Sequence, residues 1–286
     1  MKIRKAVITA AGWGTRFLPL TKAQPKEMLP LVDKPVIQYA VDEAIAAGLV
    51  EITMVTSPNK ESIEAFFSRN SKLEAFLAQK EEWGILDKVC HILDSAEVCY
   101  VRQEVPLGLG HAVLTARQSV GNEPFALLLP DDIFEDELLG PMMRLHDQYG
   151  ASIVAVEKMA GRDIERYGVI RPEEIAPGVY RVLDLVEKPS WKEAPSDLAI
   201  VGRYIFTPEI FPALEATLPG KNNEIQLTDA MKLLLKKQPL YAFEYRGVHH
   251  DVGIPFGWLK SLTVLSLRHP ELGPPFKEFL KKLKLD

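Results

Sequence analysis

Short apolar runs alternate with amphipathic helical segments through the first 150 residues, and this rhythm constrains the fold more than any other feature. Residues 125–129 are continuously apolar, which is typical of a parallel strand buried on both faces. Residues 6–9, 51–56 and 98–101 have the same strand-like character. Between these runs, helical spacing of apolar residues occurs at 35–47, 59–67, 71–83 and 109–118. The alternation predicts a doubly wound, mostly parallel, Rossmann-like α/β sheet.

After about residue 150 the pattern changes. Strand-like runs follow one another with fewer helices between them, at 152–156, 169–171, 179–186 and 199–206. Helical spacing returns at 209–216, 227–237 and 256–267, and residues 274–285 form a short lysine-rich amphipathic segment. We therefore expect an antiparallel extension that covers one side of the sheet. Because no repeat or low-complexity linker interrupts the chain, we predict one domain over residues 1–286, with halves at about 1–150 and 151–270 and a C-terminal helix at 271–286.

Composition excludes several classes of protein. Lysine and arginine number 34 and aspartate and glutamate 39, so a net charge of −5 argues against a nucleic-acid partner bound through overall basicity. The glycine-rich residues 12–16 interrupt the first apolar run before a signal-peptide core forms, and no run approaches the roughly 20 apolar residues of a membrane helix. The two cysteines, Cys90 and Cys99, suit a reducing compartment. We expect a cytoplasmic protein without a membrane or nucleic-acid partner.

A glycine loop, Gly12-Trp13-Gly14-Thr15-Arg16, directly follows the first predicted strand. Two glycines let the backbone approach an anion closely, and Arg16 adds a fork of donors for phosphate. Lys26 supplies a second cation where the same loop could fold back. The alternative is a tight turn with a surface arginine. Phe17 replaces the third glycine of a dinucleotide fingerprint, and no Gly-Lys-Ser/Thr follows, so the spacing disfavours an NAD-dependent dehydrogenase or a P-loop enzyme.

A second loop, residues 103–108, follows the predicted strand at 98–101. It is rich in proline and glycine, and Gln103 offers both a donor and an acceptor to a flat base. A flexible connection is the alternative.

Carboxylates stand at two predicted strand ends. Asp131 and Asp132 follow the most hydrophobic strand, at the end where open α/β sheets bind ligands, and Asp251 also ends a strand. Oxygen ligands of this kind suit Mg²⁺, although Asp132 could instead cap a helix. The histidines and cysteines lack the spacing of zinc ligands.

Two further sets of polar residues are candidates for the site, and each also has a purely structural explanation. Glu187 and Lys188 end the predicted strand at 179–186, where charged residues are often merely solvated. Glu224 precedes the helix predicted at 227–237 and is a candidate for a sugar hydroxyl, whereas Gln226 or Thr228 could cap that helix.

Taken together and in this order, these segments resemble the sugar nucleotidylyltransferases, and most closely the bacterial UTP–glucose-1-phosphate uridylyltransferase family. The resemblance spans about residues 3–265. The matching segments are residues 7–19, 25–30, 102–103, 108–112, 128–132, 167–168, 187–189, 199–204, 207–211 and 224–230.

The resemblance implies a role for each matching residue. The triphosphate of UTP would be held by Ala11, Gly12, Gly14, Thr15, Arg16 and Lys26, and the uracil by Gln103 and Gly108. Mg²⁺ would be bound by Asp131 and Asp251. The sugar 1-phosphate would contact Gly168, Glu187, Lys188, Gly202 and Glu224, with Lys188 on its phosphate. Arg16, Lys26 and Lys188 would be the catalytic cations. The half at about 1–150 would bind the nucleotide and the half at about 151–270 the sugar phosphate.

The implied reaction is a direct in-line attack of α-D-glucose 1-phosphate on UTP, which gives UDP-glucose and pyrophosphate. A phosphate monoester has a second pKa of about 6, so the nucleophile needs no general base at neutral pH. The family also implies a homo-oligomer, a dimer or a tetramer. The open alternatives are another NTP and sugar 1-phosphate pair, and a non-catalytic nucleotide-sugar sensor on the same scaffold. Three departures from the family pattern, His249, His250 and Pro255, leave the sugar undecided.

Overall fold

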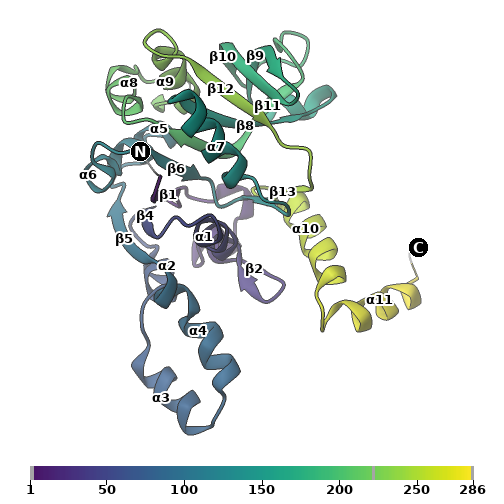
Figure 1. The fold of residues 1–286 in the computed structure, drawn as a ribbon. Helices are drawn as coiled ribbons and strands as arrows, with labels where there is room; N and C mark the ends of the chain where they lie inside the picture. The colour runs from purple at the N-terminus through teal and green to yellow at the C-terminus, as the bar shows by residue number, and fades with distance from the viewer. Residues whose placement is uncertain (1–2, 221–222, 285–286) are drawn as a thin grey trace.

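The computed structural model describes residues 3–220 and 223–284, and within them a nine-stranded sheet forms the centre of the molecule (Figure 1). The strand order across the sheet is β5-β4-β1-β6-β11-β8-β12-β10-β9. In chain order these strands are β1 (Lys5–Thr9), β4 (Glu51–Thr56), β5 (Glu97–Arg102), β6 (Phe125–Leu128), β8 (Ser152–Lys158), β9 (Gly168–Ala176), β10 (Val179–Glu187), β11 (Leu198–Phe206) and β12 (Leu240–Glu244).

The sheet is mixed, and the prediction of a mostly parallel sheet is wrong in this respect. β5, β4, β1 and β6 are mutually parallel, as predicted for the first half. β11 then pairs antiparallel with both β6 and β8, and β9, β10 and β12 add further antiparallel pairs. All nine residues of β11 are buried, so this strand continues the sheet in its own plane. The second half therefore extends the sheet rather than covering one side of it, and one sheet spans both halves.

Helices cover both faces of the sheet. The helices are α1 (Val36–Ala46), α2 (Glu61–Phe66), α3 (Ser71–Gln79), α4 (Trp83–Ser95), α5 (Leu109–Thr115), α6 (Arg117–Val120), α7 (Leu139–Tyr149), α8 (Ile210–Ala216), α9 (Leu227–Leu234), α10 (Pro255–Arg268) and α11 (Gly273–Lys282). Apolar residues of α5, α8 and α9 share one buried cluster with Val7 and Leu127, whereas α1 and α7 share another with Ile8 and Leu128. Because alternate strand residues point to opposite faces, β1, β4 and β6 each contribute to both clusters.

Small elements complete the chain. They are the strands β2 (Pro30–Leu31), β3 (Lys34–Pro35), β7 (Asp132–Phe134) and β13 (His249–Asp251), and the 3₁₀ turns η1 (Thr15–Phe17), η2 (Leu20–Lys22), η3 (Lys26–Met28) and η4 (Gly161–Arg166). β13 pairs antiparallel with β7, which brings the C-terminal part of the chain back to the end of β6. This pairing positions the candidate site.

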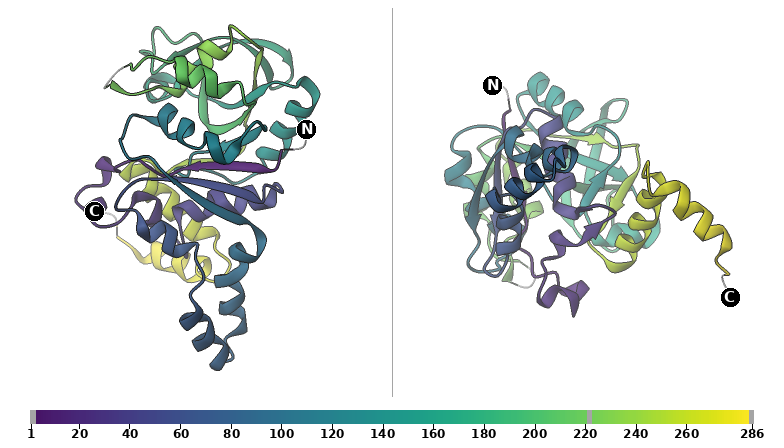
Figure 2. Two further views of the ribbon diagram at one scale, coloured as in Figure 1. Left: turned by 90° about the vertical axis from the view of Figure 1, so that its left-hand side faces the viewer. Right: turned by 90° about the horizontal axis from the view of Figure 1, so that it is seen from below.

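Two helical segments extend from the body of the molecule, the α3–α4 hairpin and the pair α10–α11 (Figures 1 and 2). Large apolar side chains are exposed on both, among them Trp83 on α4 and Phe256 and Phe279 on α10 and α11. Among the described residues no helix combines the length and apolar character needed to cross a bilayer.

Several elements differ from the sequence-based prediction. α4, α7, β7 and β12 were not anticipated, and β12 lies in the middle of the sheet between β8 and β10. The strand end predicted at Asp251 is confirmed by β13. The predicted helix at 109–118 is divided into α5 and α6 at Ala116. The C-terminal helix predicted at 271–286 corresponds to α11, and the last two residues of that prediction, 285 and 286, lie outside the described residues.

Candidate active site

Two adjoining cavities open at the carboxyl ends of the parallel strands. The first, about 470 Å³, is bordered by the loops after β1, β5 and β6. The second, about 250 Å³, is bordered by residues of β9, β10, β11 and β13. Asp131 and Glu224 line both. The predicted site residues of the first cavity are Ala11, Gly12, Gly14, Thr15, Lys26, Gln103 and Gly108, and those of the second are Arg16, Gly168, Glu187, Lys188, Gly202 and Asp251.

The glycine loop wraps around Lys26. Gly14 adopts φ +65°, a left-handed conformation that favours glycine, and a Cβ there would lie 3.2 Å from Cβ of Lys26. The hydroxyl of Thr21 donates to the carbonyl of Gly14 at 2.8 Å and fixes the turn. Arg16 follows in η1, and its Nη1 donates to the carbonyl of Gly253 at 3.3 Å. Arg16 therefore lines the second cavity, beside the predicted sugar-phosphate residues, rather than the first.

Lys26 and Asp131 form an ion pair, with Nζ 2.5 Å from Oδ2. Burial by itself would lower the pKa of Lys26 and raise that of Asp131. Their mutual attraction outweighs burial, so the pKa of Lys26 is raised and the pKa of Asp131 is lowered. Both side chains are thus charged at neutral pH.

A buried ion pair, which the sequence did not predict, holds the start of the glycine loop. Nζ of Lys60 lies 2.8 Å from Oε2 of Glu27 and also donates to the carbonyl of Ala10 at 2.5 Å. Burial lowers the pKa of Lys60, with the attraction of Glu27 acting against it. Lys60 connects the residue after Lys26 to the start of the glycine loop. Nothing in its sequence surroundings distinguishes it from a surface lysine.

Asp131 and Asp251 border a shared space at Gly253. A Cβ placed on Gly253 would lie 2.8 Å from Oδ2 of Asp131 and 3.1 Å from Oδ1 of Asp251. Oδ2 of Asp251 accepts a hydrogen bond from Tyr167 Oη at 2.9 Å and pairs with Arg166. A side chain at position 253 would fill the space that the two carboxylates share.

This donor set fits Mg²⁺. Carboxylate oxygens are the ligands that Mg²⁺ prefers, and it usually takes one or two of them beside substrate phosphates and water. The described residues include no cluster of three or more His, Cys, Asp or Glu side chains suited to a metal ion. A site completed by substrate oxygens needs only the two carboxylates.

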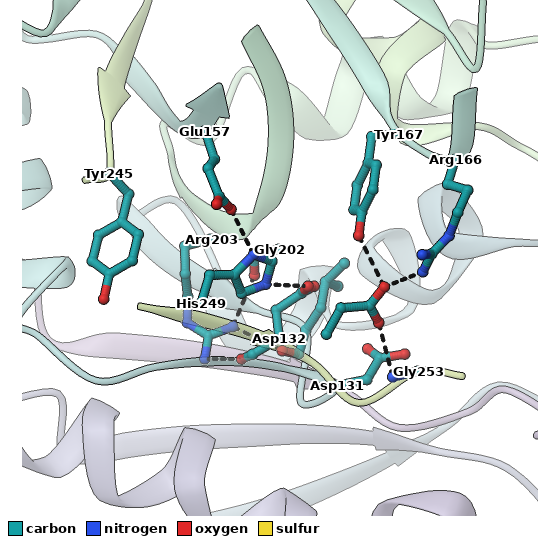
Figure 3. A network of polar contacts seen from close by, with 12 residues as sticks. Asp131, Asp132, Glu157, Arg166, Tyr167, Gly202, Arg203, Tyr245, His249 and Gly253 are labelled. Atoms are coloured by element: carbon teal, nitrogen blue, oxygen red, sulfur yellow. Dashed lines mark hydrogen bonds and ion pairs between the residues drawn. The ribbon is translucent and has the colours of Figure 1, made fainter. Parts of the chain in front are cut away.

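Asp132 does not cap a helix, which corrects one of the alternatives raised by the sequence. It begins β7, and its Oδ1 lies 2.9 Å from Nε2 of His249 (Figure 3). Nδ1 of His249 lies 2.7 Å from Oε2 of Glu157. Burial would lower the pKa of His249, but hydrogen bonds to these two carboxylates raise it to about 9. Burial raises the pKa of Asp132, with His249 acting against it. We take His249 as the charged member because both its nitrogens face carboxylates.

Arg203 holds the backbone of the same turn. Its guanidinium is fully buried and donates to the carbonyl of Asp132 at 2.8 Å (Figure 3). It also donates to the carbonyl of Leu129 at 2.7 Å and pairs with Glu43 at 2.7 Å. The neighbouring Gly202 lies against the carboxylate of Asp132, where a Cβ would collide with it. Glycine at 202 thus makes room for Asp132 as well as lining the second cavity.

The predicted sugar-phosphate residues gather at the end of β10. Oε2 of Glu187 accepts a hydrogen bond from Thr228 Oγ1 at 2.6 Å, so Thr228 orients Glu187 and makes no helix cap. Gln226 occupies the N-cap position of α9, and its side chain makes no capping bond but donates to Glu224 at 3.2 Å. Nζ of Lys188 lies 3.0 Å from Oε1 of Glu187 and is half-exposed.

Glycine is required at positions 168 and 108 because neighbouring atoms approach both backbones closely. A Cβ on Gly168 would lie 2.9 Å from Thr228 Oγ1, and one on Gly108 would lie 2.7 Å from Cβ of Glu224. Gly108 also has φ +91°. Its carbonyl accepts a hydrogen bond from Nε2 of Gln103 at 3.1 Å, so the two residues predicted to read the base are bonded to each other.

Comparison with known proteins defines the class. The nucleotidyl transferase family model matches residues 5–261, and the chain belongs to this family. It is accordingly an enzyme, a nucleotidyltransferase.

Two curated relatives indicate which nucleotidyltransferases the chain resembles. The chain is 46% identical to the UTP–glucose-1-phosphate uridylyltransferase of Staphylococcus epidermidis over 286 residues, 99% of each chain. It is 46% identical to the UTP–glucose-1-phosphate uridylyltransferase YngB of Bacillus subtilis over 282 residues, 98% of this chain and 95% of the relative.

Solved structures agree. A UDP-glucose pyrophosphorylase complexed with UDP-glucose superposes with a TM-score of 0.85 at 44% identity, over 93% of this chain and 100% of the other. The UTP-bound enzyme of Acinetobacter baumannii gives 0.91 at 39% identity, over 99% and 100%. The resemblance inferred from the sequence motifs is confirmed.

Proposed function

We propose that this nucleotidyltransferase transfers the uridylyl group of UTP to α-D-glucose 1-phosphate, giving UDP-glucose and pyrophosphate. The observation that carries the proposal is the position of Asp131 where the two cavities adjoin. Predicted nucleotide residues line one cavity and predicted sugar-phosphate residues line the other. The names of the relatives, and the UTP and UDP-glucose bound in the two solved structures, support the same pair of substrates.

UTP would occupy the first cavity, with its triphosphate along the amides of the glycine loop and Lys26. Glucose 1-phosphate would occupy the second, with Glu187 on sugar hydroxyls and Lys188 on the phosphate. Arg16 is the last residue of the glycine loop and borders the second cavity, so it would stand between the two substrates.

Chemistry would proceed by in-line attack of the sugar phosphate oxygen on the α-phosphorus of UTP. That oxygen is already ionised at neutral pH because the second pKa of a phosphate monoester is about 6. The enzyme's task is then to bring two polyanions into alignment. Arg16, Lys26 and Lys188 would offset the repulsion between them and stabilise the charge on the transferring group.

Mg²⁺ would be held by Asp131 and Asp251, the two carboxylates that border Gly253. When bound, it would neutralise charge on the phosphates as a Lewis acid. The protein's own contribution is to hold both carboxylates in place. Lys26 contacts one of them, whereas Tyr167 and Arg166 contact the other.

The three departures from the family pattern do not touch the second cavity. His249 and His250 form the first two residues of β13, and Pro255 begins α10. Among the described residues that line the second cavity, none of these three occurs. Glucose 1-phosphate therefore stays our choice of acceptor.

We also propose a homo-oligomer, a dimer or a tetramer. Phe256 and Leu259 on α10 and Phe279 on α11 are more than half exposed, and these helices extend from the body (Figure 1). Exposed apolar surface of this kind marks protein contacts. Size-exclusion chromatography with light scattering should give the mass of two or four chains. The two free cysteines suit the cytoplasm.

The substrates are tested by a panel of the four NTPs and dTTP against several sugar 1-phosphates, read by pyrophosphate release with Mg²⁺ and with EDTA. We expect UTP with glucose 1-phosphate to give the highest kcat/KM, and EDTA to abolish release. A preference for another nucleotide or sugar would replace the substrate while keeping the reaction class. Binding without turnover of any pair would indicate a sensor.

A further inference from the structure

The side chain of Gln103 is held by two acceptors at the start of the loop after β5. Its Nε2 donates to the carbonyl of Gly108 at 3.1 Å and lies 2.9 Å from Nδ1 of His111 in α5. A carbonyl oxygen can only accept, so the amide nitrogen of Gln103, and not Oε1, must face Gly108. The second amide hydrogen is then available to His111, whose Nδ1 accepts it when the ring is neutral and carries its proton on Nε2.

Both hydrogens of the Gln103 carboxamide are therefore used inside the protein. The residue is only 5% exposed, yet it lines the first cavity. Within the described residues no protein donor bonds to its Oε1. What Gln103 can offer a base in that cavity is an acceptor and not a donor.

We propose that His111 sets the base specificity of this enzyme by holding the Gln103 carboxamide with its oxygen available to the nucleotide. His111 is a positioning residue because it acts through Gln103. The inference rests on the proposed function. It adds the residue that makes the enzyme distinguish uracil from cytosine, two bases of the same size.

The chemistry of the bases explains the discrimination. Uracil carries an N–H donor at ring position 3, whereas cytosine carries an unprotonated nitrogen there. A fixed acceptor oxygen bonds to the first and repels the second, and an unpaired polar contact of this kind costs far more than a small difference in shape. A carboxamide turned by 180° would present its hydrogens and reverse the preference.

Two contacts, with Gly108 and with His111, oppose this 180° rotation of the Gln103 carboxamide. With the amide reversed, Oε1 would face the carbonyl of Gly108, and that hydrogen bond would be lost. It would also face Nδ1 of His111, whose bond would be kept only if the ring moved its proton from Nε2 to Nδ1. The carbonyl of Gly108 is itself held, because it also accepts a hydrogen bond from the backbone N–H of Ala112 at 3.1 Å. Replacing His111 therefore removes one of two constraints.

The test is the ratio of kcat/KM for UTP to that for CTP, measured with glucose 1-phosphate and paired with calorimetric binding of both nucleotides. In His111→Leu we expect the ratio to fall about five- to tenfold, as one hydrogen bond of this kind allows. His111→Asn keeps an acceptor at the δ position and should retain most of the ratio. If His111→Leu does not fold, His111→Ala replaces it, and we expect the same fall in the ratio.

Thr115→Ala is the matched control. Its hydroxyl donates to the carbonyl of His111 at 2.9 Å within the same helix, away from Gln103. Loss of this bond should leave the ratio unchanged even if the helix is weakened.

An unchanged ratio in the folded leucine or alanine variant would overturn the inference, and so would an equal fall in His111→Asn or Thr115→Ala. The wild-type measurement separates this outcome from failure of the proposed function. A wild-type enzyme that does not prefer UTP contradicts the function, whereas one that does, with an unchanged variant ratio, contradicts only the role of His111.

Discussion

The ammonium of Lys26 lies 2.5 Å from Oδ2 of Asp131, although 105 residues separate them in the chain. The pair stands where the two cavities adjoin, and each partner keeps the other charged at neutral pH. In the proposed function, Lys26 would be a cation for the triphosphate and Asp131 would be a carboxylate for Mg²⁺. Under that proposal nucleotide, metal and acceptor would meet at this ion pair, and the predictions below follow from it.

Asp131→Asn removes the charge while keeping the shape of the side chain. We expect turnover to fall by orders of magnitude, because a metal clamp contributes several kcal/mol to charge stabilisation. Steady-state kinetics over a range of Mg²⁺ concentration measures this. Asp147→Asn, on the exposed side of α7, is the control and should behave as wild type. Normal Mg²⁺-dependent turnover in Asp131→Asn would remove Asp131 from the metal site.

Lys188→Ala should raise KM for glucose 1-phosphate and lower kcat, because one contact both binds and orients the attacking phosphate. Affinity for UTP alone should change little, since Lys188 lines only the second cavity of the two. Calorimetric titration of each substrate beside kinetics checks both statements. Lys192→Ala, four residues on and packed over Trp191, is the matched control. Lost UTP affinity with intact sugar-phosphate affinity would show that the cation is assigned to the wrong substrate.

Arg203→Met should destabilise the fold by about 3–5 kcal/mol, because removing one partner of a buried ion pair leaves Glu43 unpaired. The same change frees the carbonyls of Leu129 and Asp132, so activity should fall in the remaining folded protein. Urea denaturation gives the free energy of unfolding. Arg162→Met, on the exposed side of η4, should cost under about 0.5 kcal/mol. Equal stability of the two variants would contradict a structural role for Arg203.

The His249 network predicts a pH dependence of stability. Folding raises the pKa of His249 from 6.5 to about 9, so the stabilisation is complete below pH 6.5 and is lost as pH rises through 9. The difference in Tm between wild type and His249→Gln should therefore shrink by several degrees between pH 6.5 and 9.5. Thermal unfolding of both proteins across this range measures it. A difference that stays constant or grows with pH would show that the ring is neutral.

The site residues that could be predicted from the sequence pattern alone lie at the ends of parallel strands. Gly12, Gln103 and Asp131 each follow a strand of the parallel half, and such strands deliver their carboxyl ends to one edge. Their convergence could thus be expected from strand order alone. The roles of Gly168, Glu187 and Gly202 came from family resemblance, because antiparallel strands set no common edge.

The unpredicted part depends on long-range pairing of short elements. β7 has only three residues, too few for any periodic signal, and the strand end predicted at Asp251 did not reveal its pairing partner. The pairing of β7 with β13 brings His249 to Asp132. Lys60 reaches Glu27 across the loop in the same way. α4 was not predicted either; of its apolar residues, Trp83, Ile85 and Val89 are exposed, whereas Cys90 and Ile92 are buried. Such contacts belong to tertiary structure and leave no local pattern.

Transfer of the uridylyl group, which carries the α-phosphorus of UTP, is the most direct test of the account. The wild-type enzyme is incubated with Mg²⁺, glucose 1-phosphate and UTP labelled with ³²P at either the α or the γ position. We predict that the α label appears in UDP-glucose and the γ label in pyrophosphate, each only when glucose 1-phosphate is present. Release of the α label as UMP, or no transfer to the sugar despite UTP binding, would contradict the assignment of Asp131 and its two cavities to uridylyl transfer.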